Sequence, residues 1–507
     1  MSSGGAYQLV SNKGIQDRLL YNTDMLNEII HKYKARKMKD AILKFPNLTR
    51  QQLCDKFDNF DPPLEFIEQS HILHINSKFK PFVHIAREYS KTLSNQSNSL
   101  LGSRCSFTIP VIGEYINDSV VHLRLTGLKA LNAIDKVKYV EFLGHRIIKN
   151  VRLTIGNNVI DEYTSNAYNA HWQFDVPVNK EDGYLRGVGQ ETPKQGYVTA
   201  DPINDEHREY RWFGTGPQTY KINHDDVELW IPLLFWFNNI KTALPNFTLN
   251  SQQTVVELEF ESVDNIVAVA DYGGGGLFTP PVISRSELYV NHIFLIPEIL
   301  ELVSNKFSFQ LVRVHKEFTQ KILSNSNTIK LQQLKWPVES IYFTFKPNAN
   351  LKHSQKWHRN TLVKERTVSV PVLNAGDLNS ASVIYYDEYE PIKSLELTSQ
   401  NNILFPQAPA SFFNNYVPYR FGDKLKTPKD LGNYMINFNE NPGEYQPSGH
   451  FNISRSRELY LNYLSNLDPD TNSDIIDINN PCLLTVQARC INFLIIKDGN
   501  AVLRYAT

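Results

Sequence analysis

Cysteine is scarce in this sequence, and the few cysteines present form no recognisable motif. Only four occur among the 507 residues (Cys54, Cys105, Cys482 and Cys490), and no two of them have the C-x-x-C spacing. Zinc and redox sites usually carry that spacing, and a disulfide framework in a chain of this length would use more cysteines. We therefore expect free thiols and a reducing compartment.

Long apolar runs are also missing. The longest, near residues 229–237, is far shorter than the roughly 20 residues that a helix needs to cross a bilayer. The opening Met-Ser-Ser-Gly-Gly-Ala contains no basic segment followed by an apolar core, so no signal peptide is visible. We expect a soluble protein that is made in the cytoplasm.

An excess of charge of either sign is absent as well. The chain has 52 Lys and Arg against 53 Asp and Glu, which gives a formal net charge of −1. A protein that holds nucleic acid by bulk charge needs a basic face, so this balance excludes that class and predicts no direct nucleic-acid partner. Hydrophobic residues make up 41% and aromatic residues 12% of the chain, enough to bury large cores.

Common catalytic and cofactor motifs do not occur. There is no G-x-S-x-G, and the glycine run at 273–276 is not followed by Gly-Lys-Ser/Thr, so it is not a phosphate-binding loop. Four successive glycines have little conformational preference. Together with Pro280 and Pro281 they predict a flexible linker between two domains of roughly 200 residues each.

Two histidine clusters and one acidic pair remain as candidates for chemistry. Residues three apart on a strand point to opposite faces, so His71 and His74 would not converge on one metal ion. His353 and His358 lack a partnered acid or cysteine, and the adjacent carboxylates at 225–226 are typical of a solvated turn. We predict a protein that is not an enzyme, with no catalytic, cofactor-binding or metal-binding residue.

Strands dominate the chain. Apolar and polar residues alternate with period two, which places one face of each segment in a core. The clearest segments are 105–109, 121–125, 151–155 (followed by a hairpin signal at 156–158), 256–260 and 341–345. Between residues 307 and 315 the apolar phase slips at Leu311-Val312, which predicts a β-bulge.

Helical pattern is concentrated near the amino terminus. Apolar residues recur at three-to-four spacing after Thr23, and Thr49 with Gln52 fits a capping box in front of a second, short helix. The first helix contains a basic run at 32–39. This run is either an ordinary solvated helix face or a contact for an anionic surface or an acidic partner.

A series of distinctive segments follows in one order along the whole chain. They are 4–6, 79–82, 161–165, 188–191, 216–218, 229–238, 311–316, 334–339, the run Glu-Tyr-Gln-Pro-Ser-Gly-His-Phe-Asn-Ile-Ser-Arg-Ser-Arg-Glu at 444–458, and 501–507. In these segments the chain resembles the double jelly-roll major capsid proteins of nucleocytoplasmic large DNA viruses, in particular the asfarvirus type. The turn-rich insertions at 179–226 and 347–390 look shorter than in that type, so its outer-face features are not carried over.

The resemblance implies an all-β fold of two consecutive eight-stranded jelly rolls with a short helical amino-terminal segment. On this basis we assign residues 1–68 to a base segment, 69–262 to jelly roll 1, 263–284 to the Gly/Pro linker and 285–507 to jelly roll 2. The insertions at 179–226 and 347–390 are expected on the outward face of the shell.

The resemblance also implies a function and partners. It predicts a homotrimeric, pseudo-hexagonal capsomer of an icosahedral shell, assembled in the host cytoplasm and located in the virion. Expected partners are neighbouring capsomers, minor capsid and penton proteins and, indirectly, an inner membrane; the need for a dedicated folding chaperone stays open. Two alternatives are a trimeric scaffold that shapes the viral membrane during assembly and, more remotely, a β-sandwich enzyme or lectin.

Overall fold

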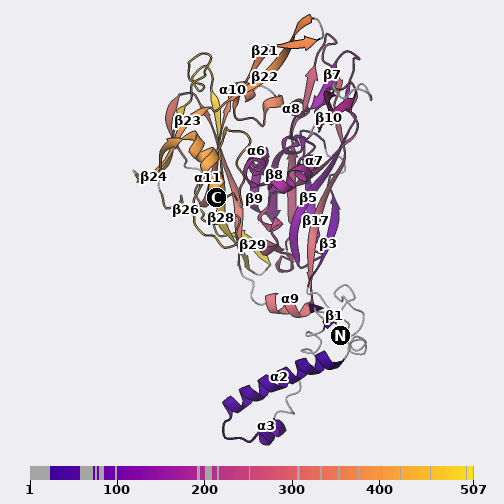
Figure 1. Ribbon diagram of the computed structural model, residues 1–507, viewed down its shortest axis with the longest axis vertical. Coiled ribbons are helices and arrows are strands. Elements are labelled where there is room, and N and C mark those ends of the chain that lie inside the picture. Colours follow the sequence, from indigo (N-terminus) through magenta and orange to yellow (C-terminus); the bar gives the residue numbers. More distant parts are fainter. Residues whose placement is uncertain are drawn as a thin grey trace. The chain divides into compact units, whose positions relative to one another are not determined.

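The computed structural model describes most of the chain (Figure 1). The residues described are 23–56, 72–74, 77–78, 85–96, 100–190, 194–199, 208–213, 216–249, 252–304, 309–331, 334–351, 354–374, 377–400, 402–422, 424–456, 458–497 and 499–505. The chain forms two compact units, the first of residues 1–88 and 293–305 and the second of residues 89–292 and 306–507.

The first unit is mainly helical in its described part. It contains α2 (Thr23–Lys44), α3 (Arg50–Lys56), the paired strands β1 (Ile72–His74) and β2 (Ser77–Lys78), and α9 (Pro297–Ser304). The helix predicted after Thr23 is confirmed, and the basic run 32–39 lies along it with most of its side chains exposed. Among the described residues, no helix is long and apolar enough to span a membrane.

A capping box begins α3, as predicted. The backbone N–H of Gln52 donates to Thr49 Oγ1 at 3.5 Å, and the backbone N–H of Thr49 donates to Gln52 Oε1 at 3.0 Å. Two N–H groups that have no partner inside the helix are satisfied in this way.

A five-stranded sheet and a four-stranded sheet, here called the first sheet group, come from residues 85–295. One has the strand order β12 (Val227–Pro232), β5 (Tyr115–Thr126), β17 (Val282–Leu295) and β3 (Ile85–Leu93), and β13 (Leu244–Pro245) also pairs with β5; the other has the order β4 (Arg104–Ile109), β14 (Thr254–Phe260), β8 (Ile148–Ile155) and β9 (Asn158–Thr164). The segments predicted at 105–109, 121–125, 151–155 and 256–260 are strands of this group, and β8 and β9 form the predicted hairpin.

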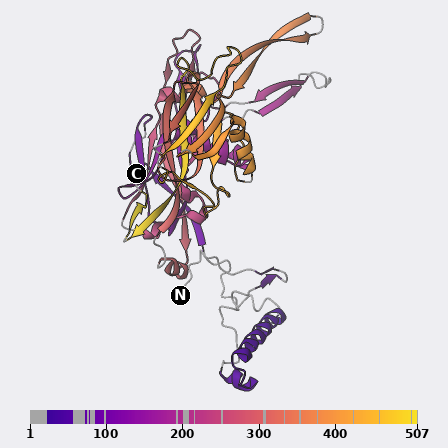
Figure 2. The same cartoon turned by 90° about the vertical axis from the view of Figure 1, so that its left-hand side faces the viewer.

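The second sheet group repeats this plan with later residues (Figure 2). One sheet has the order β18 (Phe309–Ile322), β28 (Cys482–Lys497), β20 (Pro337–Pro347) and β25 (Asn433–Asn437), and β26 (Phe451–Asn452) and β29 (Asn500–Leu503) pair at its side; the other has the order β19 (Ser326–Lys330), β27 (Leu459–Ser465), β23 (Ile392–Ser399) and β24 (Asn402–Pro409). Strand β20 contains the alternating segment predicted at 341–345.

One continuous apolar core runs through both sheet groups. In β5 the alternate residues Val121, Leu123 and Leu125 are fully buried, and in β20 so are Phe343 and Phe345. Successive strand residues point to opposite faces, so alternation in sequence places every second side chain in the core. Burying one such side chain stabilises the fold by about 1.5–3 kcal/mol.

The two long insertions are more regular than their sequences indicate. The first contains α7 (Glu181–Gly187) and the hairpin of β10 (Lys194–Thr199) and β11 (Arg208–Phe213); the second contains the hairpin of β21 (Leu362–Asn374) and β22 (Asp377–Tyr389). The description of these stretches as turn-rich is therefore wrong, most clearly for the second. Figure 2 shows both hairpins projecting away from the sheets.

The bulge predicted at 311–312 is wrong. Strand β18 pairs with β28 along its length without a shift of register. The change of phase in the sequence arises because Gln310 is buried, where its Nε2 donates to the carbonyl oxygens of Thr242 (3.0 Å) and Ala243 (2.9 Å). A polar residue thus takes an inward position, and Leu311 lies on the opposite, partly exposed face.

The glycine run at 273–276 is a fixed turn and not a linker. It connects β15 (Val267–Ala270) with β16 (Phe278–Thr279), which pair with β7 (Lys136–Tyr139) and β6 (Lys129–Ala130). The buried carboxylate of Asp135 accepts hydrogen bonds from the backbone N–H groups of Tyr272 (3.0 Å), Gly274 (3.1 Å) and Gly276 (3.0 Å). Burial on its own raises the pKa of this carboxyl, but the hydrogen bonds outweigh it and the pKa is lowered.

The predicted boundary between the two β domains is also misplaced. Strand β17 is hydrogen-bonded between β5 and β3, so its residues from 285 onward belong to the first sheet group and not to the second. The chain passes from one group to the other between Leu295, where β17 ends, and Phe309, where β18 begins.

Replacing Gly274 tests the fixed turn. A Cβ at this position would overlap the Asp135 carboxylate, so we expect Gly274→Ala to lower the free energy of unfolding by about 2 kcal/mol. Gly183→Ala is the matched control, because a Cβ there has nothing within 4 Å and Gly183 lies in α7, where alanine is favoured. Denaturant unfolding measures the stability of both variants. Equal stability would contradict the view that Asp135 holds the glycine turn in place.

Candidate functional site at the seam between the sheet groups

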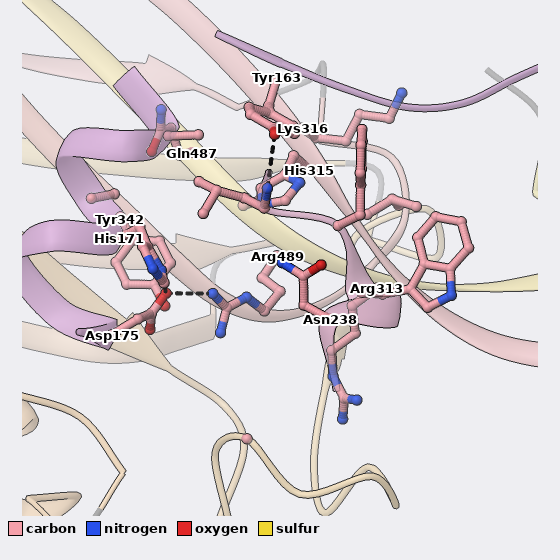
Figure 3. A pocket seen from close by; sticks show the side chains of 18 of the residues that line it. Tyr163, His171, Asp175, Asn238, Arg313, His315, Lys316, Tyr342, Gln487 and Arg489 are labelled. Carbon is pink, nitrogen blue, oxygen red and sulfur yellow. Dashed lines mark hydrogen bonds and ion pairs between the residues drawn. The ribbon is translucent and has the colours of Figure 1, made fainter. Parts of the chain in front are cut away.

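A cavity of about 360 Å³ lies where the two sheet groups meet (Figure 3). The first group lines it with α6 (Ser165–Ala170), η3 (His171–Asp175) and the stretch 232–239, and the second group with β18, β20 and β28. The polar and charged side chains around it include Tyr163, His171, Asp175, Asn238, Arg313, His315, Lys316, Tyr342, Gln487 and Arg489. We call the contacts between the two sheet groups the seam.

An ion pair between Asp175 and Arg489 crosses the seam beside this cavity. Asp175 ends the π-helical turn η3, and its Oδ2 accepts from Arg489 Nη2 at 2.6 Å, with His171 Nδ1 at 3.2 Å (Figure 3). Burial on its own raises the pKa of Asp175, but the charge of Arg489 and the hydrogen bond with His171 outweigh it and hold the pKa well below its ordinary value. The carboxylate therefore stays ionised at neutral pH.

A second carboxylate, Asp161 of β9, is bound by His315 of β18. Its Oδ1 accepts the backbone N–H of His315 at 2.8 Å, and its Oδ2 lies 3.0 Å from His315 Nδ1. Asp161 is only 3% exposed. Nearby, Glu317 of β18 accepts from Thr164 Oγ1 (2.5 Å) and Asn166 Nδ2 (2.9 Å) of the first group.

A third carboxylate, Glu181 of α7, holds two lysines of the second group. Its Oε1 accepts from Lys426 Nζ at 2.9 Å and its Oε2 from Lys429 Nζ at 2.5 Å. Burial on its own raises the pKa of Glu181. The hydrogen bonds from the two lysines outweigh this effect, and the pKa lies below its ordinary value. Lys426 Nζ also lies 3.8 Å from the ring centroid of Trp172, close enough for a cation–π contact.

The predicted histidine cluster proves to be part of the seam. His358 is buried, and its Nε2 lies 3.1 Å from Glu141 Oε2 of the first group, so the expectation that it lacks an acidic partner is wrong. Trp357 Nε1 donates to the backbone oxygen of Glu141 at 2.8 Å. His353 lies outside the described residues.

The remaining candidates from the sequence lie elsewhere. Asp226 pairs with Arg124 at 2.7 Å, and both Asp226 and its neighbour Asp225 are exposed. His74 lies on β1, and His71 is outside the described residues. Within the described part of the chain, no group of three or more His, Cys, Asp or Glu is arranged to hold a metal ion.

Paired carboxylates define what the seam can do chemically. Asp161, Asp175 and Glu181 come from the first sheet group, and each is partnered by a basic side chain of the second. In each pair, the carboxylate of one sheet group is bonded to a side chain that belongs to the other half of the chain. The arrangement is that of cross-links between two sandwiches.

Sequence interpretation assigns none of these carboxylates to a site. From the sequence, segments 161–165 and 311–316 are used only as motifs that carry the family resemblance. In the structure, Asp161 and His315 from these two segments meet at the seam. Asp175 had one local signal, since residues 165–175 interrupt the alternating pattern directly after β9.

Two family models match the chain, and they divide it where the sheet groups divide. The model "Major capsid protein N-terminus" matches residues 76–296, and the model "Large eukaryotic DNA virus major capsid protein" matches residues 303–503. The chain belongs to the family of large eukaryotic DNA virus major capsid proteins. It is a major capsid protein of a large DNA virus, and its place is the capsid of the virion.

Individual relatives agree with this assignment. The major capsid protein of African swine fever virus (isolate Pig/Kenya/KEN-50/1950) is 26% identical over 673 aligned positions that cover both chains completely. That of Phaeocystis pouchetii virus is 23% identical over 289 positions, which cover 55% of this chain and 52% of the relative. The 673 aligned positions exceed the 507 residues of this chain, so the swine fever virus protein has segments without a counterpart here.

Comparison with solved structures identifies the fold. The Faustovirus major capsid protein superposes with a TM-score of 0.71 at 26% identity, over 96% of this chain and all of its own. The PBCV-1 virus capsid protein has a TM-score of 0.61 at 18% identity, over 85% of this chain and all of its own, a likeness of fold alone. The predicted all-β double jelly roll is confirmed, and the two sheet groups are its jelly rolls.

Breaking the Asp175–Arg489 pair should destabilise the protein in a pH-dependent way. We expect Asp175→Asn to lower the free energy of unfolding by roughly 3 kcal/mol at pH 7, because Arg489 then stays partly buried without its counter-ion. The folded-state pKa of Asp175 lies below the ordinary value of 3.8, so its contribution is present above that pH and is lost as the pH falls below it. The wild type and the variant should therefore converge in acid.

Urea unfolding at a series of pH values measures this difference. Glu440→Gln is the matched control, because Glu440 pairs with Arg420 on the surface, where an ion pair contributes little. A difference between the Asp175→Asn variant and the wild type that stays constant down to pH 3 would show that the carboxylate charge is not what stabilises the seam.

Proposed function

We propose that this capsid protein forms a homotrimer whose six jelly rolls approximate a hexagon, and that these capsomers tile an icosahedral shell over an internal membrane. The observation that carries the proposal is the seam, because it holds two eight-stranded jelly rolls in one compact unit. Three such rigid pairs around an axis give six similar lobes. Together the lobes have a roughly hexagonal outline, and hexagons tile a surface. A permanent trimer contact would bury more than about 2,000 Å².

The mechanism proposed here is packing and not catalysis. The carboxylates at the seam are engaged by basic residues, which supports a structural role for them. Neighbouring capsomers are direct partners of a capsid protein, and we further propose minor capsid and penton proteins, indirect contact with the inner membrane and assembly in the host cytoplasm. A dedicated folding chaperone is an additional proposed partner.

The oligomeric state can be tested directly. Light scattering of the purified protein at micromolar concentration should give a mass of about three times the chain mass of 58.3 kDa, with no decrease on dilution. A particle that stays near 58.3 kDa at every concentration and salt would refute the trimer.

We also propose that the basic run on α2 contacts an acidic partner or anionic headgroups at the inner side of the shell. Arg36, Lys37 and Lys39 are exposed on this helix, and one lysine near an anionic surface contributes about 1 kcal/mol of attraction. Replacing Lys34, Arg36, Lys37 and Lys39 with Gln should therefore leave the oligomer intact and reduce the yield of particles.

Particle yield in infected or co-expressing cells measures the effect of this charge removal. The matched control replaces four exposed lysines of the jelly rolls with Gln, namely Lys180, Lys241, Lys321 and Lys393. If both variants assemble as well as the wild type, the basic run is an ordinary solvated helix face.

A further inference from the structure

Exposed apolar side chains gather on the loops at one end of the first jelly roll. Leu131, Ile134 and Leu277 are each 61% exposed and Tyr272 is 62% exposed. We call these four residues the tip cluster. They lie on the loop between β6 and β7 and on the glycine turn between β15 and β16, at the end of β17 opposite to Leu295 (Figure 1).

Backbone contacts bring these loops together into one surface. Strands β6 and β16 pair, and next to them the backbone N–H of Leu131 donates to the carbonyl oxygen of Leu277 at 2.9 Å. The loop before β12 joins them, since the N–H of Ala130 donates to the carbonyl oxygen of Ile222 at 2.8 Å. Ile222 is 40% exposed and extends the apolar surface.

The tip cluster is presented on a fixed backbone. The buried Asp135 lies directly after Ile134 in the chain and holds the glycine turn through the N–H groups of Tyr272, Gly274 and Gly276. Asn132 Nδ2 donates to the carbonyl oxygen of Gly274 and ties the two loops once more. These hydrogen bonds fix the backbone of the two loops, so the exposed apolar side chains stay in solvent and do not collapse onto the jelly roll.

Lysines border the tip cluster. Lys129 and Lys136 are exposed, Lys138 and Lys221 are half-buried, and Lys136 Nζ lies 5.9 Å from the ring centroid of Tyr272. The exposed acids on these loops are Asp225, Asp226 and Asp271. Asp226 pairs with Arg124 at 2.7 Å, and Asp271 Oδ1 accepts the N–H groups of Gly273 (2.8 Å) and Gly275 (3.2 Å). The surface is thus apolar at its centre and mainly basic at its border.

This combination of apolar and basic side chains suits the surface of an anionic lipid bilayer. Leucine and isoleucine bury well at the boundary between lipid headgroups and acyl chains, tyrosine favours that boundary, and lysines at the border meet anionic headgroups. We propose that the tip cluster docks the first jelly roll onto an anionic lipid bilayer. The proposal concerns the loops at the end of β17 opposite to Leu295 and does not depend on the trimer.

A second copy of this chain fits the surface less well. The exposed parts of four such side chains amount to on the order of 400 Å², about half of the ~800 Å² that each partner contributes to a stable protein interface. Each of the four is more than half exposed, so none of them is held in a preformed contact with the jelly roll's own core.

Vesicle flotation of the full-length protein tests the proposal. The wild type should float with vesicles of phosphatidylcholine and phosphatidylserine, bind vesicles of phosphatidylcholine alone more weakly, and release from the anionic vesicles at high salt. The double variant Leu131→Ser, Leu277→Ser should bind the anionic vesicles at least roughly tenfold more weakly. Lys129→Gln with Lys136→Gln should remove the preference for phosphatidylserine.

The matched control removes equally exposed apolar side chains from other loops. Val178 and Ile478 are each 75% exposed, and Val178→Ser with Ile478→Ser should float like the wild type. The proposal is overturned if the wild type binds neither kind of vesicle, or if the Leu131→Ser, Leu277→Ser variant binds as the wild type does. A change in the light-scattering mass of that variant would also overturn it, because the tip cluster would then be a contact between copies.

Discussion

Buried carboxylates at the seam constrain the rest of the double jelly roll. The side chain of Asp175 is only 15% exposed, and its partner Arg489 belongs to the other jelly roll. Removing one partner from a buried charge pair costs about 3–5 kcal/mol, because the remaining charge has neither water nor a counter-ion. The jelly rolls therefore cannot rotate against each other without breaking such pairs, and they act as one rigid block.

Local patterns in the sequence were sufficient for five of the strands and for one helix start. Alternation identifies β4, β5, β8, β14 and β20 because each strand has one face in the core, and this requirement depends on the strand alone. The capping box at Thr49 is equally local, since its two hydrogen bonds join residues three apart. The double jelly-roll topology came from the family resemblance, because alternation does not specify which strands pair.

The errors arise where a distant residue determines the local conformation. Gln310 breaks the apolar phase of β18 because two carbonyl groups of residues 242 and 243 receive its amide, and neither is visible from residues 307–315. The glycine run resembles a linker in the sequence because the residue that fixes it, Asp135, lies more than 130 positions earlier. Its carboxylate accepts the backbone N–H of Gly274. His358 seems unpartnered because Glu141 lies in the other half of the chain.

Charged contacts also give the seam a specificity that an apolar seam would lack. A chain with two jelly rolls of the same plan can pair them within one molecule or with the wrong lobe of another copy. Apolar surfaces tolerate such mispairing, because dispersion and burial depend little on register. In the observed register, Asp161, Asp175 and Glu181 each meet a basic side chain, whereas a shifted lobe would leave buried charges unpaired. The pairing that builds the rigid block is therefore also the one that mispaired lobes cannot reproduce.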